Sequence, residues 1–191
     1  SDEWKVMALS ALDAEDSIVK KYIHVFKNAT CDGGIAPFLK NEFFNTDSPR
    51  EKYLTTPALW EALDFNGFNV NQNRTDLRQW QINVATAMQK FISDFTYDAL
   101  SNVSKINRSR SKSICLSGGF FMNCVFNGVL ERSGLYENVF VSQSPADLGN
   151  SIGSALFIYH QVLRNKRNLS DQPVLFTSTY CSSDVKSVLE N

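Results

Sequence analysis

The sequence predicts an α/β protein in which helices flank a mainly parallel sheet. Two short apolar segments, 113–116 and 138–142, each lead through a short connection into a helical segment. This order of strand, helix, strand and helix favours parallel strands joined by right-handed crossovers. With 191 residues, of which 43% are hydrophobic, the chain is also large enough to bury a core. We therefore expect one main α/β domain.

The first part of the chain is expected to be mostly helical. Residues 13–27 place apolar side chains on one face of a helix, and 57–63 form a short helix with Pro57 in its first turn. Between these helices, Gly33-Gly34 marks a turn or hairpin tip. The strongest pattern runs from an N-cap at Thr75 towards Leu100, with apolar residues at three- and four-residue steps. A helix of that length needs a large partner surface, and we expect the parallel sheet to provide it.

The second part of the chain is expected to hold the sheet. The strand over 113–116 is followed by a helix over 122–132, which ends at Gly134 in the position after the C-cap. The strand over 138–142 is followed by a helix over 150–163. The charged residues beyond it are typical of a linker, and the tail from Val174 is expected to form a strand and a short helix.

Composition excludes several classes of partner. Nineteen basic residues oppose 20 acidic ones, so a net charge of -1 provides no field that attracts nucleic acid or an anionic membrane. The apolar runs are too short to span a bilayer, and no signal-peptide pattern opens the chain. The 4 cysteines lack paired metal spacing, and we expect Cys115 and Cys124 to be free, buried thiols. These observations favour a cytoplasmic protein that binds neither nucleic acid nor a membrane.

The first candidate site is the turn Ser117-Gly118-Gly119. Without β-carbons, backbone amides can approach a ligand closely, and the helix that follows directs its positive end towards it. Neither a Walker A lysine nor a GxGxxG spacing is present, so a tight turn without a ligand is an equally good interpretation. Asn123 lies one helical turn further on, where its amide would meet a ribose or phosphate or else lie on an exposed helix face.

The second candidate site is Asp147, at the carboxyl end of the next strand. A carboxylate there can bind a hard cation that holds phosphate oxygens. Position alone favours the alternative, an acid stabilised at a helix N-terminus. Gly149 follows at the start of the predicted helix. One acid cannot hold a catalytic metal, so we expect an incomplete active site with no identifiable catalytic residue.

Four segments resemble NodU/CmcH-type O-carbamoyltransferases. Residues 3–9 (EWKVMAL) are similar to the family's E-[YW]-K-V-M-G-L-A, and residues 116–128 to its L-A-G-G-V-A-L-N-x-x-x-N-G. Residues 143–156 resemble P-A-x-x-D-x-G-x-x-x-G-A-A-L, and 83–89 match the helix that precedes the glycines. Their order and spacing agree over nearly the whole chain.

The resemblance implies an actin/Hsp70/sugar-kinase-type (ribonuclease H-like) ATPase fold. Residues 1–165 would be the second half of that domain, and 166–191 a linker and the start of a further domain. In the family this domain joins carbamoyl phosphate and ATP into carbamoyl-adenylate, and a further domain passes the carbamoyl group to a small hydroxylated acceptor. The implied cofactors are ATP and a divalent metal, iron or magnesium, and a homodimer is one candidate assembly. We expect the chain to be part of a longer protein and inactive alone.

The resemblance also assigns residues. Asp147 corresponds to the metal ligand, and the nucleotide-binding positions are Lys5, Gly118, Gly119, Asn123 and Gly149. The paired histidines that complete the metal site in the family would lie upstream. Phe120-Phe121 replaces smaller residues, which would narrow or reshape the nucleotide pocket. Two alternatives stay open: a sugar or acid kinase on the same fold, and a non-catalytic nucleotide-binding or oligomerisation domain.

Overall fold

The computed structural model has a mixed α/β fold that is mostly helical. It describes residues 3–31, 38–45, 54–65, 74–106, 112–142 and 144–166. The chain divides into two compact units, 1–149 and 150–191, which are described separately below. The first unit contains a small antiparallel pair, β1 (Thr30–Cys31) with β2 (Phe38–Leu39), and a parallel pair, β3 (Ser113–Leu116) with β4 (Asn138–Val141).

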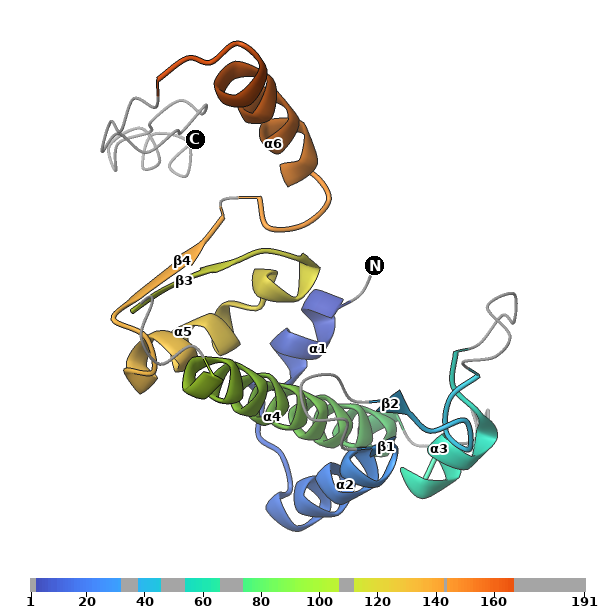
Figure 1. The fold of residues 1–191 in the computed structure, drawn as a ribbon. Coiled ribbons are helices and arrows are strands. Elements are labelled where there is room, and N and C mark those ends of the chain that lie inside the picture. The colour runs from blue at the N-terminus through green and yellow to red at the C-terminus, as the bar shows by residue number, and fades with distance from the viewer. Residues whose placement is uncertain are drawn as a thin grey trace, which may run out of the picture. The chain divides into compact units, whose positions relative to one another are not determined.

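Four helices form the first half of unit 1. They are α1 (Glu3–Leu9), α2 (Asp16–Asn28), α3 (Pro57–Ala62) and the long α4 (Arg74–Ile106). Figure 1 shows α2 and α1 packed along α4. The core between the helices consists of Val19, Tyr22, Phe26, Ala29, Leu59, Leu63 and Ala87, all buried. The predicted helices are confirmed, except that α4 begins at Arg74, so Thr75 lies inside the helix and is not its N-cap. The hairpin is confirmed as well, although its tip at 32–37 lies outside the described residues.

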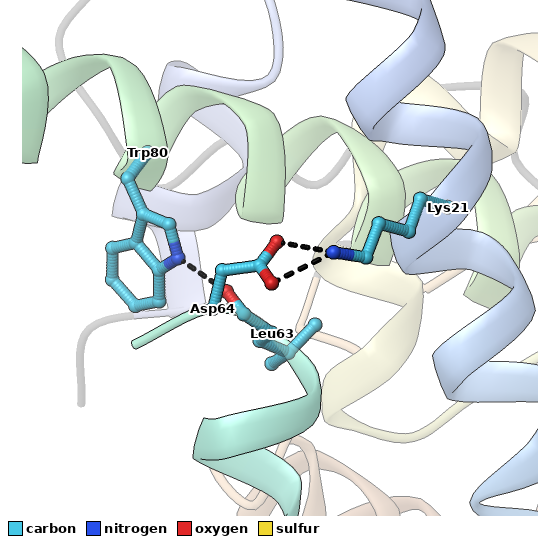
Figure 2. A network of polar contacts seen from close by, with 4 residues as sticks. All are labelled: Lys21, Leu63, Asp64 and Trp80. Atoms are coloured by element: carbon cyan, nitrogen blue, oxygen red, sulfur yellow. Dashed lines mark hydrogen bonds and ion pairs between the residues drawn. The ribbon is translucent and has the colours of Figure 1, made fainter. Parts of the chain in front are cut away.

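A polar contact network at the end of α3 ties this helix to its neighbours (Figure 2). Lys21 of α2 donates to both carboxylate oxygens of Asp64 at 2.7 Å. The indole N–H of Trp80, on α4, donates to the carbonyl of Leu63 at 2.7 Å. Asp64 adopts φ 59, a left-handed conformation that side chains with a β-carbon rarely take. We call Lys21, Leu63, Asp64 and Trp80 the α3 clasp.

The long helix α4 packs mainly against other helices, so the expectation that the sheet is its main partner is wrong. Trp80, Val84 and Phe91 pack on the core between the helices, and only Tyr97 and Leu100 pack on the sheet side. The reason is size. At 1.5 Å per residue, 33 residues span about 50 Å. A strand of 4 residues spans only about 13 Å.

The sheet half of unit 1 follows the predicted order. The parallel register runs from Ser113 opposite Asn138 to Leu116 opposite Val141. Between the strands, α5 (Cys124–Ser133) ends at Gly134, whose φ of 68 confirms the predicted left-handed cap. The core of this half consists of Leu116, Phe126, Leu130 and Tyr136.

Cys115 and Cys124 are free but exposed, so the prediction that they are buried is wrong. In β3, Ile114 and Leu116 face the core, and the period of two therefore turns Cys115 outward. Cys124 is exposed as well, because it is the first residue of α5. Cys115 pairs in register with Phe140, which is 61% exposed, so this face of the two strands is uncovered among the described residues.

The second unit contains the last predicted helix. It begins as α6 (Gly149–Phe157) and ends in a π-helical turn, Ile158–Val162. The ring Nδ1 of His160 lies 3.1 Å from the carbonyl oxygen of Asn165. The strand and helix expected after Val174 lie outside the described residues. Across the described ranges, none of the helices combines the length and apolar character needed to cross a membrane.

Candidate functional site at two strand ends

The loops after β3 and β4 contact each other directly. Because the strands are parallel and in register, both loops leave the same edge of the sheet. The amide of Gly118 donates to the carbonyl of Pro145 at 2.6 Å, and the Ser117 hydroxyl donates to the same oxygen at 3.3 Å. The glycine turn and the loop that carries Asp147 are therefore held together by the backbone.

Gly118 is required for its backbone conformation. Its φ of 116 lies in a region that residues with a β-carbon rarely adopt. A β-carbon on Gly118 or Gly119 would meet no atom of the described residues within 4 Å, so they leave the space beside the turn open. This open space fits the predicted close approach of a ligand to the backbone. The Gly118 amide itself is already used by Pro145.

The helix after the glycines begins later than predicted. Gly119–Met122 form a short 3₁₀ turn, η1, and α5 starts only at Cys124. The Asn123 side-chain oxygen caps α5 by accepting from the amide of Phe126 at 3.1 Å. The α-helix therefore does not start directly at the glycines, and the Asn123 side chain already satisfies one of its first-turn amides.

Asn123 is also paired with a residue that the sequence analysis did not assign. Its Nδ2 donates to Oε1 of Gln89 at 3.0 Å, and Nε2 of Gln89 lies 3.3 Å from Asn123 Oδ1. Gln89 belongs to α4 and is only 7% exposed. In the sequence, the signal for a role of Gln89 is that a polar residue ends the family-like segment 83–89. Asn123 itself is half-buried between the turn and α4.

The bulky residues of the turn pack into the core. The rings of Phe120 and Phe121 have centroids 5.1 and 6.3 Å from that of Phe126. Asn127 donates from Nδ2 to the Phe121 carbonyl at 2.8 Å, while its buried Oδ1 finds no partner among the described residues. Met122, at 64% exposure, is the turn residue that faces solvent. Both phenylalanines thus brace the turn from the core side.

The loop that carries Asp147 closes tightly on itself. The Gly149 amide donates to the carbonyl of Ala146 at 2.9 Å. A β-carbon at Gly149 would lie 2.3 Å from the Ser144 carbonyl oxygen, far inside contact distance. Glycine is therefore needed at 149 for the loop to close, and this closure presents the exposed side chain of Asp147.

The remaining assigned residue, Lys5, lies elsewhere in unit 1. It lines a groove of about 1000 Å³ formed by α1, α3 and α4, together with Trp60 and Trp80. Its Nζ lies 5.7 Å from the centre of the Trp4 ring. Helix α1 nevertheless contacts the start of α5, because the Met7 sulfur lies 3.7 Å from the thiol of Cys124.

The described residues do not complete a metal site. Asp147 contributes one carboxylate, and within the described ranges no three His, Cys, Asp or Glu side chains gather to hold an ion. A divalent cation takes several ligands. The side chains described here therefore do not hold such an ion by themselves.

A family model and several known proteins are similar to this chain. Residues 1–156 match the family model described as Carbamoyltransferase N-terminus. Nodulation protein NolO of Bradyrhizobium diazoefficiens is 28% identical over 146 residues, which cover 69% of this chain and 25% of NolO. Nodulation protein U of Azorhizobium caulinodans is 40% identical over 53 residues, 28% of this chain and 10% of that protein.

A third relative is the uncharacterized protein sll1178 of Synechocystis, 43% identical over 56 residues, 29% of this chain and 9% of that protein. The chain thus spans a quarter or less of the length of these three relatives. The family model covers most of the chain, including β3, the glycine turn and the Asp147 loop. The chain belongs to the carbamoyltransferase family.

Proposed function

We propose that the two strand-end loops form one wall of the nucleotide site of an ATP-dependent O-carbamoyltransferase. The enzyme would form carbamoyl-adenylate from carbamoyl phosphate, ATP and water, with release of phosphate and pyrophosphate. It would then pass the carbamoyl group to a hydroxyl of a small acceptor, with AMP as the leaving group. The observation that carries the proposal is the bond from the Gly118 amide to the Pro145 carbonyl. It holds the glycine turn against the Asp147 loop in a chain of this family.

Each loop would contribute a different kind of contact. The glycine turn offers open space beside a backbone without side chains, which suits the phosphates of ATP. Asp147 offers an exposed carboxylate on the neighbouring loop. With iron or magnesium as the divalent cofactor, this carboxylate would be one ligand among several, the others coming from outside the described residues. Such an ion would neutralise phosphate charge when bound.

The test is an assay of pyrophosphate release by the complete protein. We expect pyrophosphate from ATP only when carbamoyl phosphate is present. Asp147→Ala should lower the rate by at least about a hundredfold, because a metal ligand contributes several kcal/mol to such a site. Asp98→Ala, which removes an exposed acid of α4, is the matched control and should leave the rate unchanged.

The products separate this proposal from its alternatives. An unchanged rate in Asp147→Ala would overturn the assignment of Asp147. Release of ADP in place of pyrophosphate would indicate a sugar or acid kinase on the same fold. ATP binding measured by calorimetry without turnover would indicate a nucleotide-binding or oligomerisation domain that has lost catalysis.

A further inference from the structure

We propose that Gln89 is a positioning residue for the glycine turn, acting through Asn123. The inference rests on the proposed function, since the turn matters here as a nucleotide-binding element. Gln89 lies on α4, separated by 34 positions from Asn123, and the two side-chain amides are within hydrogen-bond distance at both ends, 3.0 and 3.3 Å. Neither residue needs to touch the nucleotide for this role.

Asn123 stands at the junction of two elements. Its amide donates to the Phe120 carbonyl at 3.0 Å and ends the 3₁₀ turn, and its carbonyl accepts from the amide of Asn127 at 3.0 Å as α5 begins. Its side-chain oxygen accepts from the Phe126 amide as well as from Gln89. A displacement of this one side chain would therefore move the end of the turn and the start of α5 together.

Gln89 connects that junction to the long helix α4. It is 7% exposed on α4, close to Ala85 and Ala87, which are 4% and 0% exposed. Its Nε2 also lies 3.1 Å from the hydroxyl of Ser93, one helical turn further along α4. The turn is thus fixed at both ends: at Gly118 by the Pro145 carbonyl and at Asn123 by α4. Loss of Gln89 would leave the half-buried side-chain amide of Asn123 without this hydrogen-bond partner.

The test compares variants in the complete protein by the pyrophosphate assay. Gln89→Met keeps the length of the side chain and removes both amide contacts. We expect the KM for ATP to rise about tenfold while kcat changes less than about threefold, because the turn binds phosphates less well once it is released. Gln81→Met, the same change at an exposed position of α4, is the matched control. Ser93→Ala removes only the other contact of Gln89 and should also leave the KM unchanged.

Equal KM values in Gln89→Met and Gln81→Met would overturn the proposal. If Gln89→Met does not fold, Gln89→Glu replaces it, since it keeps the acceptor for Asn123 Nδ2 and loses the donor. If the unsubstituted protein releases no pyrophosphate, the proposed function fails, and amide hydrogen exchange over residues 118–127 decides about Gln89. Faster exchange in the Gln89 variant than in the Gln81 variant supports the positioning role, and equal exchange contradicts it.

Discussion

The two halves of unit 1 are stabilised in different ways. In the helical half, side chains from α2, α3 and α4 form a continuous apolar core, and the α3 clasp adds a few polar contacts at its edge. In the sheet half, the core is smaller and the loops at the strand ends depend on single hydrogen bonds. The candidate site therefore lies in the sheet half, where a few polar contacts determine the position of the loops. The helical half acts as the scaffold, and burial of apolar side chains determines its structure.

This difference separates the effects expected of substitutions. Changes in the helical core should lower the free energy of unfolding, because buried methylene groups lose their packing partners. Changes at the strand ends should alter the position of a loop with a smaller effect on global stability. Gly118 and Gly149 illustrate the second case, since one is required for its backbone angle and the other for the space it leaves empty.

The largest effect is expected for Gly149→Ala. The new β-carbon would lie 2.3 Å from the Ser144 carbonyl oxygen, so the backbone of the Asp147 loop must move. We expect a loss of about 1–3 kcal/mol in the free energy of unfolding, as for other overpacked sites. Urea denaturation followed by circular dichroism would measure it.

Gly153→Ala provides the control for that substitution. It lies on the same helix, α6, and its β-carbon would meet no atom within 4 Å. Replacing a glycine inside a helix with alanine should stabilise the chain by roughly 0.5–1 kcal/mol. A loss of stability in both variants, or in neither, would show that the Asp147 loop is not constrained in the way the structure indicates.

Local pattern predicts the order of elements, including two successive strands that each end at a candidate site. The strand over 113–116 and the helix end at Gly134 are predicted correctly, because a short apolar run and a glycine each indicate the local backbone conformation. The 3₁₀ turn was not predicted, since residues 119–122 carry no signal that separates it from the first turn of an α-helix.

Tertiary partners were harder to predict than elements. Gln89 ends the family-like segment 83–89, but neither local sequence specifies that it pairs with Asn123, 34 positions away. The partner of α4 was misassigned because its apolar stripe fits helices and sheets equally well. Cys115 is expected to be buried because the local sequence of β3 is compatible with a larger sheet that is covered on both faces. In the structure β3 pairs only with β4 among the described residues, and the face that carries Cys115 is exposed.

A smaller effect is expected at Asp64, which tests how much the helical half depends on its clasp. Asp64→Ala should cost about 1–2 kcal/mol, because it loses the contact with Lys21 and because alanine tolerates a φ of 59 less well than aspartate does. The lost ion pair accounts for less than about 1 kcal/mol of this, since both side chains are roughly half-exposed. Asp64→Gly relieves the backbone conformation and should be close to neutral in urea denaturation.

The comparison of these two variants is the informative one. Asp64→Asn should fall between them, because asparagine tolerates the left-handed conformation better than alanine does. If Asp64→Gly is destabilised as much as Asp64→Ala, the loss of the contact with Lys21, which both variants share, outweighs the backbone conformation. The helical half would then resemble the sheet half in its dependence on single polar contacts.

The smallest effect is confined to alkaline pH and involves one tyrosine in each half. Burial, followed by the negative charge of Asp64, raises the pKa of Tyr22 to about 12 from its usual 10.0. Burial alone raises the pKa of Tyr136, in the sheet half. A raised pKa means that the folded state holds the phenolic proton more tightly than the unfolded chain does. The resulting stabilisation is complete below pH 10 and is lost as the pH rises towards 12.

Spectrophotometric titration of the two phenols can separate these causes. Asp64→Asn should lower the pKa of Tyr22, because it removes the charge that opposes ionisation, and should leave Tyr136 unchanged. Tyr22→Phe and Tyr136→Phe assign the two titrations. The free energy of unfolding of Tyr22→Phe should fall less steeply above pH 10 than that of the unsubstituted chain, because it lacks the proton that must be lost. An equal shift of both tyrosines in Asp64→Asn would mean that the charge acts through the whole unit, and that the two halves are not electrostatically independent.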